Sequence, residues 1–472
     1  MTAGVRTVSL NIQAENKNIM AIPHKHKGRY IFHFTDIRNL DSIIKNGLLC
    51  TNLKNEKEIK HKNIANQRIQ ERRARMDVPV GPGGKVHDYV PFYFSSINPM
   101  LLSKLIQKNV DQPGIIYFCV SIDRLEKEDA VFTDASANTV EAPEFFDDTS
   151  DLDELDWKII DSKSWKQDSE EDKHKKMAEA LIASRVDISE ISHIVVYNEH
   201  VKKYVQKIFD DNGVKAPKIL FDGYFPLERY KFYYTKFFFG DRKNETLVTG
   251  PEFLKNSYET TLKKIKKKRS GGRGMYRFET ISDLIAAIEE DFSVLPELKG
   301  IIGLYQDYSP HDDFLEDHTK KVVRAMKSTG YYKKASETKK SLLVLAAYLH
   351  DIGKGPKKRW DNGKMPRPYT DHPADAAEML VRILSEEVRN LTDEDVREIC
   401  MLVIYHDIIG DCLGKGRDKE QLAGIVTGED DFEMLCAIAL ADTSAIGDLW
   451  ATQIELNKAA LKAEVMDLKR LS

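Results

Sequence analysis

The sequence predicts an α+β domain followed by an all-α domain, and three observations support this prediction. Between Gly28 and Phe238, short runs rich in β-branched and aromatic residues alternate with helical patterns. After Met275, apolar residues recur at intervals of three and four almost to the end of the sequence, which is typical of helices. Between the two parts stands "KKIKKKRSGGRG" (Lys263–Gly274), whose basic residues and glycines indicate a linker.

A chain of 472 residues is long enough for two domains with separate cores. We expect a leader over residues 1–25, an α+β domain over 26–240, a basic and glycine-containing linker region over 241–280 and an all-α domain over 281–472. The linker allows two interpretations, a solvated hinge or an arm that touches nucleic-acid phosphates.

The expected elements of the first domain begin with a strand at "RYIFHFT". The next segment, "DIRNLDSIIKNG", has helical spacing of Ile and Leu and is ended by Gly47. Further strands are expected at "VPFYFSS", "GIIYFCVSI", "ISHIVVY", "KILFDG" and "RYKFYYT". The acidic stretch from Glu141 to Asp156 is predicted to be a surface loop, and "EDKHKKMAEALIASRV" a helix that leads to "ISHIVVY".

Composition and charge limit the partners, the metal sites and the cellular location that we expect for this protein. The net charge of −4 indicates no general affinity for nucleic acid, so any such binding must come from a local patch. The cysteines are scattered, which argues for reduced thiols and against a disulfide framework or a cysteine zinc site: Cys50, Cys119, Cys400, Cys412 and Cys436. The apolar run Leu342–Leu349 is far shorter than a membrane span, and the N-terminus lacks a signal-peptide pattern. We therefore expect a cytoplasmic protein with no membrane partner.

Three features of the first domain could take part in chemistry. His33 and Thr35 alternate on one strand and so face the same side, where they could hold ribose hydroxyls, although a lone strand histidine is more often structural. Glu179 sits between two alanines on an apolar segment, so it needs either a basic partner or a role in a cleft. The stretch from Ile69 to Ser96 joins a basic helix to an aromatic strand, which is either a solvated face beside a core strand or part of a site.

Four segments occur in the order found in the DarT family of DNA ADP-ribosyltransferases, which this part of the chain resembles: "FHFTDIRNLDSIIKNGLL", "IQERRARMDVPVGPGGKVHDYVPFYFSSINPML", "VFTD" and "KKMAEALIA". The resemblance implies an ADP-ribosyltransferase fold that transfers ADP-ribose from NAD⁺ to a base, expected to be thymidine, in single-stranded DNA. It further implies that Arg73 and Glu179 are catalytic. The residues implied to contact NAD⁺ are His33, Phe34, Thr35, Ser42, Cys50 and Arg73.

This chemistry suits the residue types. Breaking the nicotinamide–ribose bond builds positive charge on the ribose, which a carboxylate such as Glu179 stabilises as it develops. The cation of Arg73 favours loss of a proton from the acceptor nitrogen. Tyr93 and Phe94 could line the nicotinamide or a base, or pack in the core. Where some family members have a histidine in the substrate loop, this sequence has Ser136 nearby, so another base or RNA remains open.

The second domain carries histidines and aspartates in an ordered series on successive helical segments. This series resembles the HD superfamily of metal-dependent phosphohydrolases, whose H…HD…D pattern falls on His318, His350, Asp351 and Asp442. His372 and His406 match the subset with extra histidines, which can hold a second ion, and Lys354 would contact phosphate. Imidazole and carboxylate ligands suit Mn, Fe, Ni or Zn better than Ca.

The combined expectation is a base-modifying toxin or phage-defence enzyme, of the kind found in toxin–antitoxin pairs, with a fused HD phosphohydrolase that regulates or reverses its product. Three alternatives remain. The HD domain could only sense a nucleotide or hold structure. The protein could be a signalling phosphohydrolase with an NAD⁺-sensing N-terminal domain. It could also be a binding module with two inactive sites.

Overall fold

The computed structural model describes residues 21–65, 67–138, 142–221, 234–238, 248–271 and 276–471. It divides into two compact units, the first formed by Met1–Pro99 and Ile115–Thr235 and the second by Met100–Gly114 and Lys236–Ser472. Nearly all of the expected leader, and most of the expected strand "RYKFYYT", lie outside the described residues.

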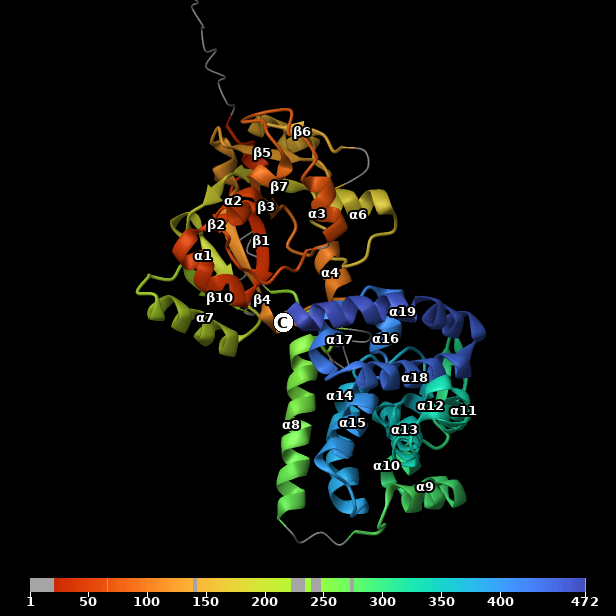
Figure 1. Cartoon of the computed structure of the whole chain (residues 1–472). Coiled ribbons are helices and arrows are strands. Elements are labelled where there is room, and N and C mark those ends of the chain that lie inside the picture. Colours follow the sequence, from red (N-terminus) through yellow and green to blue (C-terminus); the bar gives the residue numbers. More distant parts are fainter. Residues whose placement is uncertain are drawn as a thin grey trace, which may run out of the picture. The chain divides into compact units, whose positions relative to one another are not determined.

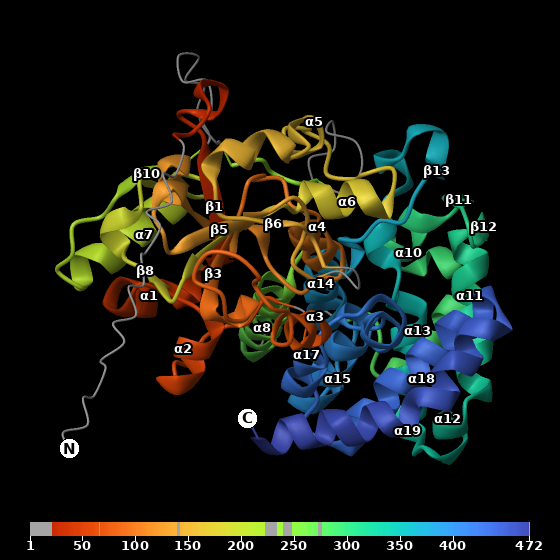
Figure 2. The same cartoon turned by 90° about the horizontal axis from the view of Figure 1, so that it is seen from above.

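The first unit is built on an eight-stranded mixed sheet in the order β10-β9-β4-β1-β3-β7-β5-β6. All described strand pairs in it are antiparallel except β9 with β10, and β10 and β6 form its two edges (Figure 2). Its strands are β1 (Tyr30–Asp36), β3 (Tyr89–Tyr93), β4 (Ile115–Ser121), β5 (Ala130–Thr133), β6 (Phe145–Phe146), β7 (Glu179–Ala183), β9 (His193–Val195) and β10 (Lys218–Leu220). A separate pair joins β2 (Leu48–Leu49) to β8 (Arg185–Val186).

Short helices flank this sheet: α1 (Leu40–Asn46), α2 (Thr51–Glu56), α3 (Gln67–Arg73), α5 (Trp157–Ile160), α6 (Glu170–Lys176) and α7 (Glu199–Asp211). Gly47 ends α1 as predicted, with φ of 77°. A Cβ at this position would lie 2.7 Å from the carbonyl oxygen of Val186, so both the backbone conformation and the space require glycine.

Two predictions for the first unit are wrong. The segment "EDKHKKMAEALIASRV" is not one helix, because α6 ends at Lys176 and Glu179 begins strand β7. The run "EALIA" has almost no polar face, so it suits a central strand covered on both sides as well as it suits a helix. The acidic stretch is also not a plain loop, since it contains β6 and a 3₁₀ helix at Thr149–Glu154.

The second unit is helical, as predicted, with a small sheet that was not predicted (Figure 1). Its helices are most of α4 (Pro99–Ile106), then α8 (Pro251–Ser270), α9 (Ile281–Glu290), α10 (Pro296–Ile301), α11 (Leu315–Ser328), α12 (Gly330–Lys334), α13 (Glu337–Leu349), α14 (His372–Arg382), α15 (Asp393–Ile404), α16 (Ile408–Gly410), α17 (Lys419–Ile425), α18 (Glu429–Ile446) and α19 (Asp448–Leu471). The sheet runs β12 (His311–Phe314), β11 (Tyr305–Tyr308), β13 (Lys364–Met365). The buried helix α13, with Leu342 to Leu349 inaccessible to solvent, is the centre of the core.

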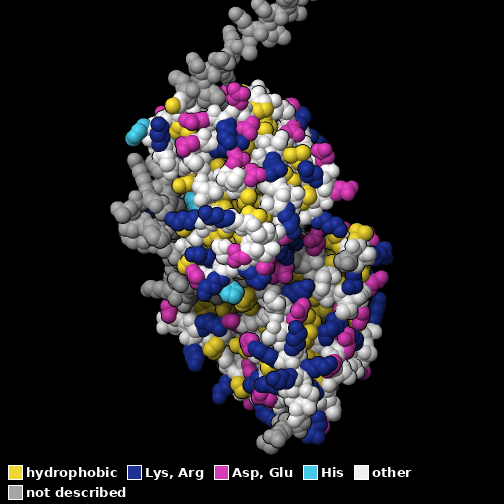
Figure 3. Space-filling view, turned by 90° about the vertical axis from the view of Figure 1, so that its left-hand side faces the viewer, with side chains coloured by type: hydrophobic (Ala, Val, Ile, Leu, Met, Phe, Trp, Pro, Cys, Tyr) yellow, Lys and Arg dark blue, Asp and Glu magenta, His cyan; other side chains and the backbone are white. Residues whose placement is uncertain are grey.

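The basic segment predicted as a linker is instead the second half of helix α8, which packs along α14 and α15 (Figure 1). Its lysines pair with acidic side chains of the same unit: Lys264 with Glu378, Lys266 with Asp393 and Lys268 with Glu386. Figure 3 shows basic and acidic side chains mingled over the face it views, without one continuous basic patch. The described part of this segment, Lys263–Gly271, is therefore a structural helix and not a hinge.

In the described part of the chain, every helix is either too short or too polar to cross a membrane.

Candidate transferase site and metal centre

The side chains of Arg73 and Glu179 form a bidentate ion pair inside the first unit. Arg73 ends α3 and Glu179 begins β7, and neither is appreciably exposed, at 6% and 0%. Nη1 of Arg73 lies 2.7 Å from Oε1 of Glu179, and Nη2 lies 2.9 Å from Oε2. Burial alone would lower the pKa of Arg73, but the charge and hydrogen bonds of Glu179 outweigh it and the pKa is raised. From the sequence, we expected either a basic partner for Glu179 or a role in a cleft, and the structure shows that Arg73 is a basic partner.

The loop after β5 completes the surroundings of Glu179. The backbone N–H of Ala137 donates to Oε1 of Glu179 at 2.9 Å, and Thr133 Oγ1 accepts from the backbone N–H of Glu179 at 3.2 Å. Oε1 thus accepts two hydrogen bonds, whereas Oε2 accepts only the one from Arg73 among the described residues. Because a carboxylate oxygen can accept two, Oε2 keeps one position for a substrate hydroxyl.

The substrate-loop residue Ser136 is buried in the same loop. Its backbone N–H donates to the carbonyl oxygen of His174 on α6 at 3.1 Å. The loop that the sequence associated with choice of the acceptor base therefore also contacts the carboxylate of Glu179, through the neighbouring Ala137.

Three of the residues expected to contact NAD⁺ lie on β1, next to β3. Nδ1 of His33 donates to the carbonyl oxygen of Pro91 at 2.7 Å, and the ring of Phe34 stacks on that of Tyr93 at 5.7 Å. Tyr93 in turn is the cross-strand neighbour of Glu179. The sheet thereby places His33 and Phe34 on β1 and Glu179 on β7, with only β3 between them, and Arg73 reaches Glu179 from the end of helix α3.

The protonation state and the tautomer of His33 follow from its burial and its hydrogen bond to Pro91. Burial lowers its pKa to about 4, so the ring is neutral at physiological pH. Since Nδ1 carries the proton for Pro91, Nε2 is left as a hydrogen-bond acceptor. Neutral His33 can therefore accept a hydrogen bond from a ribose or amide donor.

The other expected NAD⁺ contacts are engaged locally. Thr35 Oγ1 accepts from the side chain of Asn39 at 2.9 Å, and Cys50 Sγ accepts from the backbone N–H of Leu53, capping α2. Ser42, on α1, accepts from the side chain of Asn46. Their contacts with NAD⁺ stay predictions.

Sequence reasoning missed two basic residues near this site, His87 and Lys54. Burial lowers the pKa of His87, and the charges of Arg73 and Lys54 lower it further. Lys54 also acts on His33, so the four groups share one electrostatic neighbourhood. His87 lies within the quoted "HDYVPFYF" motif, but no signal in the sequence marked Lys54.

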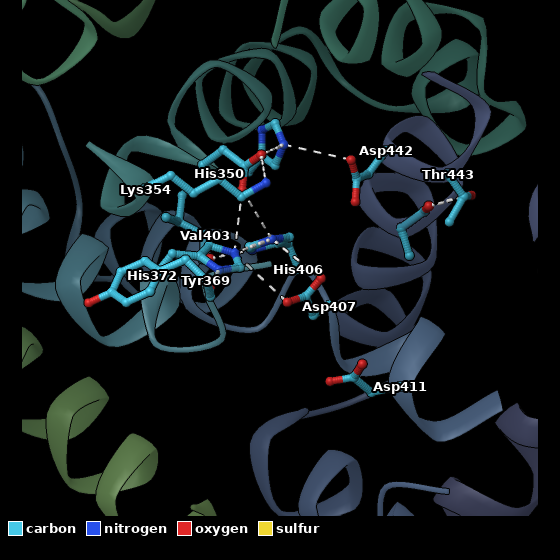
Figure 4. A network of polar contacts seen from close by, with 12 residues as sticks. His350, Lys354, Tyr369, His372, Val403, His406, Asp407, Asp411, Asp442 and Thr443 are labelled. Atoms are coloured by element: carbon cyan, nitrogen blue, oxygen red, sulfur yellow. Dashed lines mark hydrogen bonds and ion pairs between the residues drawn. The ribbon is translucent and has the colours of Figure 1, made fainter. Parts of the chain in front are cut away.

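The second unit gathers the six expected metal ligands into two groups of three. Figure 4 labels His350, His372, His406 and Asp442 among them. One group is His318, His350 and Asp442, and the other is Asp351, His372 and His406. Each group offers ligand atoms within 4.8 Å of one another, and five separate helices or helix ends supply them. We call these groups the first triad and the second triad.

The tautomers of three histidines suit a metal. Nδ1 donates to a backbone carbonyl in His350 (Ala347, 2.8 Å), His372 (Tyr369, 2.5 Å) and His406 (Val403, 2.8 Å). This fixes the proton on Nδ1 and leaves the Nε2 lone pair directed at the centre, the arrangement found in metal-binding histidines. The Nε2 atoms of His372 and His406 lie 3.1 Å apart with no proton to share, a repulsive contact that a cation between them would relieve.

Asp351 connects the two triads. Its Oδ2 lies 3.2 Å from Nε2 of His350, and its Oδ1 lies 3.3 Å from Nε2 of His372. Two atoms are buried without a hydrogen-bond partner among the described residues: Oδ1 of Asp351 and Nε2 of His350. Burial would lower the pKa of His350, but Asp351 and Asp442 together raise it to about 9, so a cation that binds its Nε2 must displace a proton from that nitrogen. Buried ligand atoms without hydrogen-bond partners, placed beside the carboxylates of Asp351 and Asp442, fit a site for one or two divalent cations.

Lys354 has a different contact from the one expected. Its ammonium donates to Oδ2 of Asp351 at 2.6 Å and to Oε1 of Gln306 at 3.1 Å, and it is buried. Its contact with phosphate stays a prediction. Gln306 belongs to the β11–β12 hairpin, which also places His311 beside His318, with ring centroids 5.2 Å apart. The unpredicted hairpin thus forms one wall of the metal centre.

Comparison with known proteins distinguishes the two units. A family model described as "ssDNA thymidine ADP-ribosyltransferase, DarT" matches residues 32–225, and a model of the HD domain matches residues 315–435. A DNA ADP-ribosyl transferase of Thermus sp. (strain 2.9) is 37% identical over 183 residues, which cover 38% of this chain and 86% of that protein. One of Escherichia coli O127:H6 is 31% identical over 177 residues, covering 36% and 80%.

Solved structures give similar matches. Thermus sp. 2.9 DarT in complex with ADP-ribosylated ssDNA has a TM-score of 0.38 at 32% identity, covering 42% of this chain and 95% of that chain. The same Thermus enzyme in complex with NAD⁺ has a TM-score of 0.36 at 29% identity, covering 42% and 96%. The sequence relationship, which spans most of the relatives' length, shows that this chain belongs to the DarT family of DNA ADP-ribosyltransferases and carries an HD domain after the transferase domain.

Proposed function

We propose that the first unit transfers ADP-ribose from NAD⁺ to thymidine in single-stranded DNA. The buried bidentate pair of Arg73 and Glu179 is the observation that carries this proposal, because it holds a carboxylate ready for charge that develops on the substrate. The relatives are DNA ADP-ribosyl transferases, and one solved relative is bound to ADP-ribosylated ssDNA.

The reaction follows from the positions of these groups. The bond between nicotinamide and ribose C1′ breaks, nicotinamide leaves with the bonding electron pair, and C1′ becomes positively charged. Oε2 of Glu179 accepts a hydrogen bond from a ribose hydroxyl and stabilises that charge. The thymine ring nitrogen bonds to C1′ and loses its proton to solvent water, which the nearby cation of Arg73 favours by stabilising negative charge on the ring. Neutral His33 positions NAD⁺ through Nε2.

Labelled NAD⁺ and oligonucleotides test this proposal. Glu179→Gln keeps the shape of the side chain but not its charge, so transfer should fall by about 10²–10³-fold while NAD⁺ binding changes little. Glu171→Gln, an exposed glutamate on α6, is the matched control and should keep full activity. Transfer by Glu179→Gln within a few-fold of the wild type would contradict the role of the carboxylate.

The acceptor needs a separate comparison. Single-stranded DNA with thymidine should be labelled, whereas duplex DNA hides the pairing edge of the base and should be labelled far less. Oligonucleotides without thymidine, and RNA, test the alternatives left open by Ser136. Equal labelling of duplex and single strand would count against base modification, and labelling without thymidine would replace the proposed base.

We further propose that the second unit is a metal-dependent phosphohydrolase that reverses or restrains the transferase. The two triads joined by Asp351 support it, because their histidine tautomers and unpartnered atoms suit two divalent ions. Divalent ions bound there would act as Lewis acids and lower the pKa of water toward neutrality. His318, His350 and Asp442 would hold one ion, His372 and His406 the other, and Asp351 both.

Metal content and product yield test this second proposal. Asp351→Asn should strip the protein of divalent metal in elemental analysis, whereas Asp393→Asn, an exposed control on α15, should not. His372→Ala should lower occupancy toward one ion. If the HD domain removes or restrains the modification, ADP-ribosylated DNA should accumulate in the Asp351 variant. Unchanged accumulation in that variant would mean that the two activities are independent.

A further inference from the structure

Met100–Gly114 lies between β3 and β4 in the sequence but belongs to the second unit. Asn109 carries much of its docking: its side-chain nitrogen donates to the carbonyl oxygen of Gly416 at 2.9 Å, and its side-chain oxygen accepts from the backbone N–H of Asp418 at 2.8 Å. Asp111 caps α8 by accepting from the backbone N–H groups of Glu252 and Phe253 at 2.8 and 3.1 Å. We call Met100–Gly114 the inserted segment.

Lys108 occupies an unusual position in the inserted segment. It has φ of 56°, just beyond the end of α4, where glycine or asparagine usually stands. Its carbonyl oxygen accepts from the side chain of Gln421 at 2.9 Å, which holds this conformation in place. The side chain is buried, and Nζ lies 3.9 Å from Oδ2 of Asp407 and 3.6 Å from Oδ2 of Asp411. A lysine is thus held in a costly backbone conformation with its ammonium between two carboxylates.

The two carboxylates differ in their other partners. Asp411 is also paired with Lys415 at 2.9 Å and with Arg417 at 3.4 Å. Among the described residues, Lys108 is the one lysine or arginine within 4 Å of Asp407. Removal of Lys108 would therefore leave Asp411 paired and Asp407 without its cation.

Asp407 faces the second triad from the opposite side. Its Oδ1 lies 3.6 Å from Nε2 of His406, and its Oδ2 lies 3.8 Å from Nε2 of His372 (Figure 4). These are the two lone-pair nitrogens that face each other without a proton. Asp407 therefore stands between the ammonium of Lys108 and the nitrogens of the second triad.

We propose that Lys108 is a positioning residue that competes with the metal ion of the second triad for the carboxylate of Asp407. This rests on the metal binding proposed above. With Lys108 docked, part of the negative charge of Asp407 is neutralised and the second ion is held less tightly. Without the ammonium of Lys108, the full negative charge of Asp407 would be available to that ion. The inserted segment continues directly into β4, so it offers a covalent route from the transferase sheet to the metal centre.

The test is the binding of Mn²⁺ to the metal-free full-length protein, with free ion measured by electron paramagnetic resonance. Wild-type protein should bind two ions of unequal affinity. Lys108→Gln should tighten the weaker ion by about fivefold or more and leave the tighter one unchanged. Lys108→Arg should restore wild-type affinity. Lys264→Gln, which removes an exposed cation from α8, should change neither constant.

Asp407→Asn gives a second readout that does not depend on folding of the inserted segment. It should weaken the second ion, and Lys108→Gln should then have no further effect, because the shared carboxylate is gone. Two bound ions with unchanged affinities in Lys108→Gln would overturn this inference alone. Wild-type protein that binds no Mn²⁺ would overturn the proposed metal centre as well.

Discussion

Buried polar side chains decide the chemistry of this protein at the scale of single residues. Glu179 is held by Arg73 and by a backbone N–H, so its carboxylate is already oriented before substrate binds. A buried ion pair of this kind contributes little net stability, because desolvation offsets the attraction. It is better explained by preorganisation for charge that appears only during the reaction.

Because folded His33 stays neutral to a lower pH than the unfolded chain does, the stability of the fold should fall as the solution becomes acidic. The unfolded chain takes up a proton near pH 6.5, whereas folded His33 does so only near pH 4. Its neutral form therefore stabilises the fold above pH 6.5, and this contribution is lost as pH falls toward 4, by about 2 kcal/mol between pH 7.5 and 5.0. Hydrogen exchange of the β1 amides should show this loss in wild type but not in His33→Asn. Equal acid sensitivity of both proteins would contradict the assignment.

At the scale of elements, helix α8 shows how a basic run can be structural. Arg269, in its last turn, donates to the carbonyl oxygens of Leu384, Val388, Arg389 and Leu391 at 2.6–3.3 Å. These carbonyls belong to the π-helical turn Ile383–Glu387, which continues α14, and to the segment just after that turn. Arg269 therefore fastens α8 to the end of α14.

Replacing Arg269 should thus destabilise the second unit. Arg269→Ala leaves several carbonyls without a donor and should cost about 2 kcal/mol or more, seen as a lower unfolding temperature. Lys266→Ala removes only an exposed ion pair and should leave the unfolding temperature nearly unchanged. If both variants unfold like the wild type, α8 is docked by other contacts.

Sequence patterns predicted the elements that have a clear periodicity. They missed the elements whose secondary structure depends on contacts with distant parts of the chain. The strands β1, β3 and β4 and the helix before Gly47 were predicted correctly, because alternation and a glycine stop are local signals. Glu179 was placed on a helix because "EALIA" suits either structure, and only its pairing with β3 and β5 selects the strand. The basic run of α8 resembled a linker because its acidic partners lie more than 100 residues away in the sequence.

The motifs name six candidate metal ligands, and the structure brings them together in two groups of three. The motifs gave no indication of what surrounds them. Gln306, His311 and Lys108 have no spacing that links them to the ligands, since the fold alone brings them near. Residues that touch a site from another part of the sequence escape pattern reasoning for this reason.

At the scale of the whole molecule, the boundary between the units is not one point in the chain. Because the second unit includes the inserted segment, a fragment of residues 236–472 lacks Lys108, Asn109 and Asp111. It should unfold at a lower temperature than the same unit in the full chain, and adding a peptide of residues 100–114 should restore part of the difference. A fragment as stable as the full chain would show that the inserted segment contributes nothing to the unit.

The inserted segment also sets an order of events during synthesis. Asn109 leaves the ribosome 307 residues before Gly416, its partner in the second unit. At typical elongation rates of about 5–20 residues per second, this gap lasts about 15–60 s. The last described strand of the transferase sheet ends at Leu220, so all of these strands are made before α8 and α17, the helices that the inserted segment contacts. Each newly made molecule therefore passes through a period in which its DNA-modifying half is complete and its metal-binding half is still being translated.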